Sequence, residues 1–411
     1  MYISRYIEET VKKTSKTFKV LYLGGPRQAG KTTVLKHLAK GSGMTYVTLD
    51  DREMRRLAQK DPAMFLESFT LPILIDEAQY APELFPYIKM KVDNSTKRGR
   101  FWLTGSQTFS MIKNLQESMA GRVGILKLLP LSFAEKNGIT KRKQAFFISN
   151  EKEALKQRPP VLNKDIKDIF EDIIEGSYPE LAGKNSPSAE LYYSGYLQTY
   201  IERDLSAFFG VRKQSDFHSF LQLCAARTGQ ILNISELAKD AGISVNAAKE
   251  WITILETSGI IYQLKPYHRN FSKRLIKAPK LYFLDTGLAA HLTKWKTAES
   301  LRFGNMAGAF FETWVVSEII KSYTNRGEEP PAYYYRDKEG HEIDLLLEKD
   351  GVLSPIEIKM KIAIGEDDLK HIRYLKKKHP SLIKTGVVIT ATDKMYFWDS
   401  ETVIYPATGI N

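Results

Sequence analysis

Residues 25–33 constrain the fold of this chain more than any other segment. They read Gly-Pro-Arg-Gln-Ala-Gly-Lys-Thr-Thr and fit the pattern Gly-x4-Gly-Lys-Ser/Thr. A β-prone stretch, residues 18–23, precedes them, and Val34, Leu35 and Leu38 give the following helix an apolar side. This order predicts a phosphate-binding loop, because loop N–H groups surround the anion and the helix directs its positive end at it. A glycine-rich turn without phosphate is the alternative.

The residue types in this loop match the needs of a nucleoside triphosphate. Lys31 is expected to neutralise charge at the β- and γ-phosphates, and the Thr32 hydroxyl to bind Mg²⁺. The residues expected to hold the nucleotide are Gly25, Gln28, Ala29, Gly30, Lys31, Thr32 and Thr33.

A second motif follows at residues 71–77, Leu-Pro-Ile-Leu-Ile-Asp-Glu, an apolar run that ends in two acids. It predicts a buried parallel strand that brings Asp76 and Glu77 to the sheet edge where α/β proteins bind ligands. We expect Asp76 to hold Mg²⁺ through its waters and Glu77 to polarise the attacking water, as in P-loop ATPases with an added strand between the two motifs. That intervening strand is expected at residues 44–49. A pair of helix N-cap acids is the alternative.

Residues 100–106 predict a further strand that ends in hydroxyl side chains. Thr104 or Ser106 would sense the γ-phosphate or orient water, and a strand-to-helix turn capped by Ser106 stays open beside this interpretation. Arg122 precedes a last strand at residues 124–128. It would reach phosphate within the chain or from a neighbouring subunit, although solvated arginines are common at such positions.

These segments together resemble prokaryotic AAA-superfamily ATPases whose C-terminal region is a domain of unknown function. The resemblance is carried by GPRQAGKTT, ILIDEAQ, LTGSQ and SMAGRV with LPLS, and continues in YIERDLS at 200–206 and KLYFLDTGLAAHL at 280–292. It implies a parallel-sheet AAA-type fold, with ATP and Mg²⁺ as cofactors and ATP hydrolysis as activity. The family carries no agreed biological role.

The composition agrees with a globular multidomain protein that has a polyanionic partner. The 411 residues suggest two to three domains, and 60 Lys and Arg against 48 Asp and Glu leave a net charge of +12, which favours nucleic acid over a membrane. The single cysteine, Cys224, excludes disulfide frameworks and multi-cysteine zinc sites. Neither a spanning apolar run nor an apolar leader is visible, so we expect a cytoplasmic protein.

The middle of the chain predicts helices and then a winged helix. Four tyrosines at 192, 193, 196 and 200 follow helical spacing and are expected to pack. Residues 234–255 fit a helix-turn-helix with Gly242 in the turn, and residues 260–264 fit a wing strand. Asn246, Lys249 and Glu250 would lie on the recognition helix.

A basic run follows with no acid between Glu256 and Asp285, which is typical of phosphate contacts in DNA binding. Its members are Lys265, Arg269, Lys273, Arg274, Lys277 and Lys280. Winged helices also act as lids or subunit contacts, so DNA contact is one of two alternatives.

The C-terminal region contains a hairpin that predicts a carboxylate pair. Asp350-Gly351 is a favoured two-residue turn, and if paired positions sum to 701 then Asp344 stands opposite Glu357. Such opposed acids repel unless a cation such as Mg²⁺ lies between them. Lys359 shares the face of Glu357. Pro355 belongs at an edge or bulge, and a bulge would shift this register by one.

This pattern resembles the PD-(D/E)XK nuclease core. The resemblance implies that Asp344 and Glu357 bind metal, that Lys359 positions or activates water, and that Glu312 on an upstream helix completes the metal shell. The usual proline before the first acid is replaced by Ile343. A nuclease-like fold kept for binding, with Lys359 bridging the acids, is the alternative.

We therefore expect an α/β protein that begins with a P-loop AAA-type parallel sheet. The expected parts are an ATPase domain at 1–135, a linker and helical region at 136–215, a winged helix at 216–295 and a nuclease-like α/β domain at 296–411. The expected function is an ATP-hydrolysing protein acting on DNA, with homo-oligomers open. The alternatives are a nucleotide-gated switch whose nuclease-like domain is inactive and a DNA-binding regulator with a vestigial P-loop.

Overall fold

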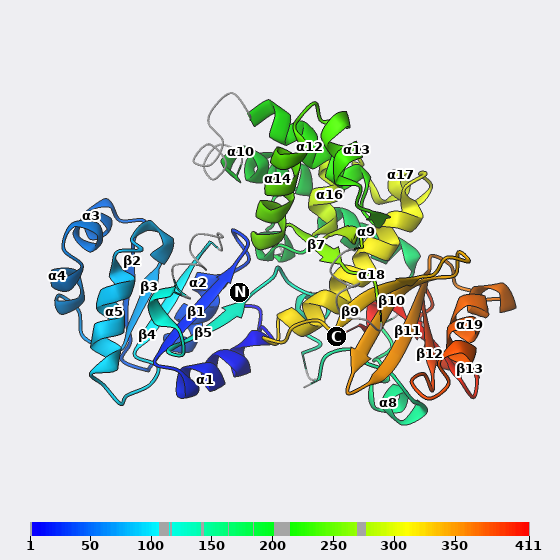
Figure 1. The fold of residues 1–411 in the computed structure, drawn as a ribbon, viewed down its shortest axis with the longest axis horizontal. Coiled ribbons are helices and arrows are strands. Elements are labelled where there is room, and N and C mark those ends of the chain that lie inside the picture. The colour runs from blue at the N-terminus through cyan, green and yellow to red at the C-terminus, as the bar shows by residue number, and fades with distance from the viewer. Residues whose placement is uncertain are drawn as a thin grey trace. The chain divides into compact units, whose positions relative to one another are not determined.

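The structure is a computed structural model that describes residues 2–106, 115, 117–140, 144–162, 164–183, 185–200, 214–268 and 277–410. The chain divides into two compact units (Figure 1). The first contains Met1–Leu131 with two short later segments, Thr257–Gly259 and Thr324–Glu328, and the second contains the remaining residues. The finer division into four parts stays a prediction. In the described part of the chain, no helix combines the length and the apolar character needed to cross a membrane.

The first unit contains a five-stranded parallel sheet, as expected from the two motifs. The order is β2-β3-β4-β1-β5. The strands are β1 (Val20–Gly25), β2 (Thr45–Thr48), β3 (Ile73–Asp76), β4 (Phe101–Ser106) and β5 (Val123–Lys127), and the helices are α1 (Ile7–Thr17), α2 (Lys31–Ala39), α3 (Arg52–Lys60), α4 (Pro62–Glu67) and α5 (Leu84–Asp93). This is the P-loop NTPase fold. The strand expected at residues 44–49 is present as β2, between the two motifs in sequence. In the sheet, however, β2 lies at the edge, and the strand that separates β1 from β3 is β4.

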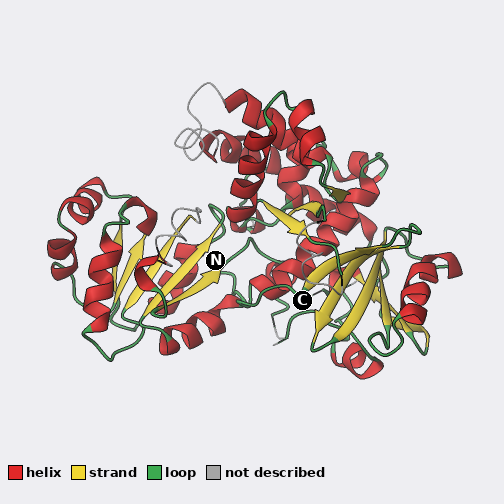
Figure 2. Ribbon diagram, in the orientation of Figure 1, coloured by secondary structure: helices red, strands yellow, loops and turns green. Residues whose placement is uncertain are grey.

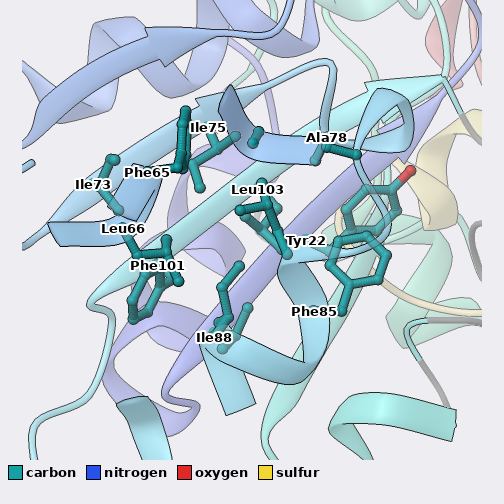
Figure 3. Packing of buried hydrophobic residues seen from close by; sticks show 14 of the residues in the cluster. Tyr22, Phe65, Leu66, Ile73, Ile75, Ala78, Phe85, Ile88, Phe101 and Leu103 are labelled. Carbon is teal, nitrogen blue, oxygen red and sulfur yellow. The ribbon is translucent and has the colours of Figure 1, made fainter. Parts of the chain in front are cut away.

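Alternate residues of the central strands fill two cores. Tyr22, Ile75 and Leu103 face one core, which α4 and α5 cover with side chains such as Phe65 and Phe85 (Figure 3). The residues between them on the strands face a second core, which α1 and α2 cover; its members include Ile7, Val11, Leu21, Val34, Leu35, Leu74 and Trp102. Burying one such side chain stabilises the fold by about 1.5–3 kcal/mol. Apolar residues on both strand faces therefore explain why these short runs do not alternate with polar residues.

Helices dominate the first half of the second unit (Figure 2). They are α7 (Phe133–Lys136), α8 (Glu151–Lys156), α9 (Ile166–Glu175), α10 (Ala189–Tyr200), α12 (Gln214–Ala226), α13 (Ile234–Asp240), α14 (Val245–Thr257), α16 (Thr286–Leu292) and α17 (Ala298–Arg302). A small antiparallel sheet of order β6-β8-β7 accompanies them, made of β6 (Gln230–Ile231), β7 (Ile261–Leu264) and β8 (Lys280–Phe283).

The tyrosines of α10 pack as expected. Tyr192, Tyr193 and Tyr196 are buried and surround Tyr178, whose hydroxyl lies 3.0 Å from that of Tyr196. The side chain of Tyr200 lies outside the described residues. This stripe is therefore core, and not a stacking platform for bases.

Asp285 connects three elements of the second unit. Its carboxylate caps α16 by accepting from the Leu288 N–H at 2.7 Å. It also accepts from the Ser177 N–H at 2.7 Å, the Ser177 hydroxyl at 2.6 Å and the Tyr193 hydroxyl at 2.7 Å. Burial and then this carboxylate raise the pKa of Tyr193 well above its usual value. The segment LDTG at 284–287 thus has a structural role.

The C-terminal part of the second unit is built on a mixed sheet of order β13-β14-β12-β11-β10-β9. Its strands are β9 (Ala332–Arg336), β10 (Glu342–Lys349), β11 (Val352–Lys359), β12 (Gly386–Thr390), β13 (Tyr396–Asp399) and β14 (Thr402–Pro406), with α18 (Ala307–Thr324) before it and α19 (Lys370–Lys378) after β11. Strands β11, β12 and β14 are parallel to one another.

The hairpin of β10 and β11 has the predicted register. Asp350 and Gly351 form the turn with φ of 51° and 74°, which is the left-handed pair that a two-residue turn requires. The pairs run from Lys349↔Val352 to Leu345↔Ile356, so each sums to 701. Pro355 pairs with Leu346 without a shift. The irregularity lies instead between β10 and β9.

Candidate functional sites

The loop between β1 and α2 has the backbone that the motif predicts. Gly25 and Gly30 have φ of 149° and 90°, and Gln28 adopts a left-handed φ of 60°. A Cβ at Gly25 would come within 2.1 Å of the Leu128 carbonyl oxygen, so this position requires glycine. Lys31 lies at the start of α2, and its Nζ donates to the Pro26 carbonyl at 2.7 Å and the Gly25 carbonyl at 3.2 Å. The lysine charge is therefore at the loop where a phosphate would lie.

The two motifs meet through a direct hydrogen bond. The Thr32 hydroxyl donates to Asp76 Oδ1 at 2.9 Å, although the residues are 44 positions apart. Asp76 is the last residue of β3 and is buried. A hydroxyl and a carboxylate oxygen side by side are the ligand types that Mg²⁺ prefers. The donor set therefore fits the expected ion.

Tyr46 on β2 is a residue of this site that the sequence did not reveal. Its hydroxyl donates to Asp76 Oδ2 at 3.0 Å, so both oxygens of the carboxylate are held. The Lys36 ammonium lies 3.6 Å from the centre of the Tyr46 ring. Burial raises the pKa of Tyr46, with the Asp76 charge acting in the same direction. One tyrosine on an edge strand gives no sequence signal for this contact.

Arg5 is a second residue that the motifs did not indicate. Its guanidinium donates to the Ala29 carbonyl at 2.9 Å and to the Leu129 carbonyl at 2.7 Å. It therefore connects the loop to the segment that follows β5.

Glu77 follows β3 in a left-handed conformation with φ of 55°, and its carboxylate accepts a hydrogen bond from the Gln79 amide. The acids do not cap the short helix that follows: Ala78–Tyr80 has no side-chain cap. The left-handed backbone carries Glu77 out of the strand direction directly after Asp76. Its expected role toward water stays a prediction.

Thr104 lies within β4, two residues before the end of the strand. It is fully buried in β4, and its hydroxyl donates to the Leu23 carbonyl at 3.0 Å. Ser106 ends β4 opposite Gly25, at the edge that the loop occupies, while its side chain lies outside the described residues. Of the two hydroxyl candidates, the geometry therefore does not favour Thr104.

Arg122 lies at the wrong edge of the sheet to contact phosphate in its own chain. It precedes β5, whose first residue, Val123, pairs with Val20 at the start of β1. The loop begins at the opposite end of β1, and a six-residue strand spans about 16 Å. Arg122 pairs instead with the Asp93 carboxylate, with Nη2 3.1 Å from Oδ2. Because parallel strands place their starts and ends at opposite edges, this position argues against a contact within the chain and fits the alternative of a solvated arginine at a strand start.

The C-terminal acids gather around Asp344, as the hairpin register predicts. Asp344 Oδ2 accepts the Ile358 N–H at 2.8 Å, which brings it beside Glu357. Glu357 is 2% exposed, and its Oε1 has no hydrogen-bond partner. Burial and then the Asp344 charge raise the pKa of Glu357 to about 8. Lys359 Nζ lies 2.8 Å from Glu357 Oε2.

Glu312 approaches this cluster from α18 but is held by other groups. The Tyr282 hydroxyl donates to Glu312 Oε1 at 2.5 Å, and Lys280 Nζ lies 3.4 Å from the same atom. Burial and then Asp344 raise the pKa of Glu312. Glu342, two residues before Asp344, also contacts Lys280, at 2.6 Å. Sequence reasoning missed Glu342 and Tyr282.

The acids at this site are not as close as a closed metal shell requires. Among the described ranges, the one set of three acidic or histidine side chains with ligand atoms all within 4.8 Å is Asp337, Glu339 and His341, in the turn between β9 and β10. Asp344 and Glu357, with the unpartnered Glu357 oxygen, fit a cation between two carboxylates. Glu312 does not complete that shell in this geometry.

The helix pair α13 and α14 presents the side chains expected on a recognition helix. Asn246, Lys249 and Glu250 are exposed on α14. Of the basic run, Lys265 and Lys277 are exposed, whereas Arg269, Lys273 and Arg274 lie outside the described residues. Lys280 was wrongly placed in this surface strip, because it is buried between carboxylates.

Comparisons with known proteins agree with the fold of the first unit. Residues 17–137 match the family described as AAA domain, residues 166–299 match a domain of unknown function (DUF8612), and residues 307–410 match another (DUF4143). The first unit is therefore an AAA-type P-loop ATPase domain.

Two relatives of this chain are uncharacterised mycobacterial proteins. Uncharacterised proteins of Mycobacterium tuberculosis and Mycobacterium bovis are each 29% identical over 345 residues, which cover 83% of this chain and 70% of theirs.

Two solved structures are more distant. A Walker-type ATPase of Pyrococcus abyssi has a TM-score of 0.43 at 13% identity and covers 69% of this chain and 94% of its own. The RuvB Holliday junction branch migration motor of Thermotoga maritima has a TM-score of 0.28 at 15% identity, covering 62% of this chain and 88% of its own. Scores this low support no conclusion about function.

Proposed function

We propose that this protein binds ATP with Mg²⁺ at residues 25–33 and hydrolyses it. The observation that carries the proposal is the 2.9 Å hydrogen bond between Thr32 and Asp76, which joins the phosphate loop to the acidic strand end. Two oxygen groups, one from the start of α2 and one from the end of β3, are held together at the edge where Lys31 also lies. This arrangement suits a triphosphate and its cation better than it suits a structural turn.

Each side chain of the site has a separate role in the proposed hydrolysis. Lys31 exchanges its carbonyl partners for β- and γ-phosphate oxygens, and Thr32 and Asp76 hold the cation. When bound, Mg²⁺ neutralises the charge that develops on the phosphate oxygens. Glu77 orients and polarises the water that attacks the γ-phosphate in line. Tyr46 keeps the Asp76 carboxylate in its orientation from the neighbouring strand.

Nucleotide binding and turnover test this proposal. We expect Lys31→Ala to lose ATP affinity in calorimetry, and Glu77→Gln to bind ATP but lose turnover by about 10²-fold or more. Lys40→Ala and Glu83→Gln, both at exposed positions of the same unit, are the matched controls. Normal turnover in Glu77→Gln would remove Glu77 from its role, and absence of heat with any purine nucleotide in the folded wild type would remove the proposal.

We further propose that α13, α14 and the small sheet form a DNA-contacting winged helix. Helix, strand, two helices and two strands follow one another here, and Lys249 with Asn246 faces solvent on the second helix of the pair. Lys249→Glu should weaken binding to labelled duplex DNA in anisotropy measurements, whereas Lys152→Glu on α8 should not. Equal effects of the two variants would indicate a general charge effect and no defined interface.

The carboxylate hairpin suggests a PD-(D/E)XK-like domain with a cation site at Asp344 and Glu357. The supporting observation is the register of β10 and β11, which brings the two acids beside Lys359. Plasmid nicking in Mn²⁺ is the test of cleavage. Nicking that persists in Asp344→Ala would show that this site is not responsible.

The second candidate is a nucleotide-gated switch whose nuclease-like domain binds a partner without cleavage. The observation that favours it is the number of lysines at the acids, because Lys280 and Lys359 already pair with three of them. Strong stimulation of ATP turnover by DNA supports the first candidate, and a flat response supports the second. Sedimentation with a non-hydrolysable ATP analogue would show whether either one acts as a homo-oligomer.

A further inference from the structure

Lys280 enters the carboxylate cluster from outside the C-terminal sheet. It is the first residue of β8, the central strand of the sheet β6-β8-β7, while the acids lie on α18, β10 and β11. Its Nζ lies 2.6 Å from Glu342 Oε1 and 3.4 Å from Glu312 Oε1. The side chain is only 6% exposed, so its charge is balanced by these carboxylates and not by water.

Neighbouring contacts fix the lysine in this position. Tyr282, on the same face of β8 two residues later, donates to Glu312 at 2.5 Å. The hydroxyl of Tyr334, from β9, donates to the Ala278 carbonyl at 2.7 Å, and Lys280 Nζ lies 5.8 Å from the centre of the Tyr334 ring. Lys280 is therefore held in place by the residues packed around it.

The electrostatics agree that Lys280 stays charged. Burial alone would lower the pKa of its ammonium, but the charges of Glu312, Asp344 and Glu342 outweigh burial and raise it. One positive charge thus serves three acids, two of which it contacts directly.

We propose that Lys280 is a resident cation that competes with divalent metal ions for this carboxylate cluster. The inference rests on the cation site proposed at Asp344 and Glu357. Two acids that would otherwise add ligands or negative potential are neutralised by the lysine. A divalent ion at Asp344 is repelled by the Lys280 ammonium. The ligand atoms that remain for the ion are a carboxylate oxygen of Asp344 and the unpartnered Oε1 of Glu357.

Removing the lysine charge should therefore strengthen metal binding. Like charges close together in a partly buried site repel substantially even at an effective dielectric constant near 20. We expect Lys280→Met to bind Mn²⁺ at least about tenfold more tightly than wild type in calorimetry on the full chain without nucleotide. Lys280→Arg keeps the charge and should behave as wild type.

A double variant shows whether the measured heat of Mn²⁺ binding comes from the site at Asp344. The gain in Lys280→Met should disappear in Lys280→Met combined with Asp344→Asn, because Asp344 is the proposed ligand and the phosphate loop is unchanged. Thermal melting gives an independent readout: Lys280→Met, with its acids unpaired, should melt below wild type without metal and recover with Mn²⁺. If Lys280→Met does not fold, Lys280→Gln replaces it, because its amide still hydrogen-bonds the acids without charge.

The outcomes separate this inference from the proposed cation site. Equal Mn²⁺ affinity in wild type and Lys280→Met, lost in Asp344→Asn, would overturn the competition while keeping the site. A gain that survives Asp344→Asn would also overturn it, because the ion would be bound elsewhere. Absence of binding in both Lys280→Met and Lys280→Gln would remove the cation site and this inference together, and would leave the proposed ATPase untouched.

Discussion

Replacement of Asp285 should destabilise the second unit far more than an ordinary surface change. The carboxylate is buried and accepts four hydrogen bonds, from Ser177, Tyr193 and Leu288. Asp285→Ala removes the N-cap of α16, which costs about 1 kcal/mol, and leaves buried donors without an acceptor at about 1–3 kcal/mol each. Allowing for water entry, we expect the free energy of unfolding to fall by about 3–5 kcal/mol.

Urea unfolding followed by tryptophan fluorescence measures this loss. Four of the five tryptophans, at 251, 295, 314 and 398, belong to the second unit, so the signal reports mainly on it. At a slope of about 2–3 kcal/mol per molar urea, the midpoint should move by roughly 1–2.5 M. Asp285→Asn, which keeps the shape but turns an amide N–H₂ toward donors, should lie between Asp285→Ala and wild type.

Asp240→Ala is the control for this experiment. Asp240 pairs with Arg227 at the surface, and such pairs contribute about 0–1 kcal/mol. If Asp285→Ala and Asp240→Ala unfold at the same urea concentration, the hydrogen bonds to Asp285 do not carry the stability assigned to them.

Three further predictions concern the two sites. Tyr46→Phe removes one of the hydrogen bonds that hold Asp76, so calorimetry should show about 2- to 12-fold weaker Mg·ATP binding but unchanged ATP binding in excess EDTA; a loss in both conditions would refute a role through the cation. Arg122→Ala should leave ATP affinity unchanged in calorimetry. The length of β1, about 16 Å, separates Arg122 from the phosphate loop and exceeds the electrostatic screening length of about 8 Å. A large loss of affinity would point to a contact from a second chain. The stability of Glu357→Gln relative to wild type should increase as pH rises from about 4.5 to about 8. The pKa of Glu357 is raised to about 8 in the folded wild type, so ionising this carboxyl costs the wild type stability across that window. A difference in melting temperature between the two proteins that does not change with pH would contradict this prediction.

Local motifs gave the sequence analysis its correct parts. The phosphate loop depends on contiguous residues whose backbone needs are specific, and Gly25 and Gly30 have the positive φ values that the motif requires. The hairpin depends on the Asp350-Gly351 turn, and one turn sets the register of every pair that follows it. Each of these two features is determined by residues within about twenty positions of one another, so it can be predicted from the local sequence alone.

The order of strands in the sheet and the contacts between distant residues could not be predicted from local motifs. The place of β4 between β1 and β3 follows from how crossover helices cover both faces of the sheet, and the order of strands along the chain does not fix it. The position of Arg122 does not depend on this order: it precedes β5, and the starts of parallel strands lie at the edge opposite the phosphate loop. Tyr46 reaches Asp76 only because β2 pairs with β3.

Lys280 shows how far a charge pattern can mislead when its partners are distant in sequence. The absence of acids between positions 256 and 285 made the run look like a solvated cationic strip, yet the acids that balance Lys280 arrive 32 and 62 residues later, at 312 and 342. A buried lysine needs such partners, since leaving it unpaired would cost several kcal/mol. Part of the positive charge of this run therefore lies inside the second unit. Among the described residues, the exposed Lys249, Lys265 and Lys277 are the candidates for phosphate contacts, and a charge-removing variant of Lys280 should leave the salt dependence of DNA binding unchanged.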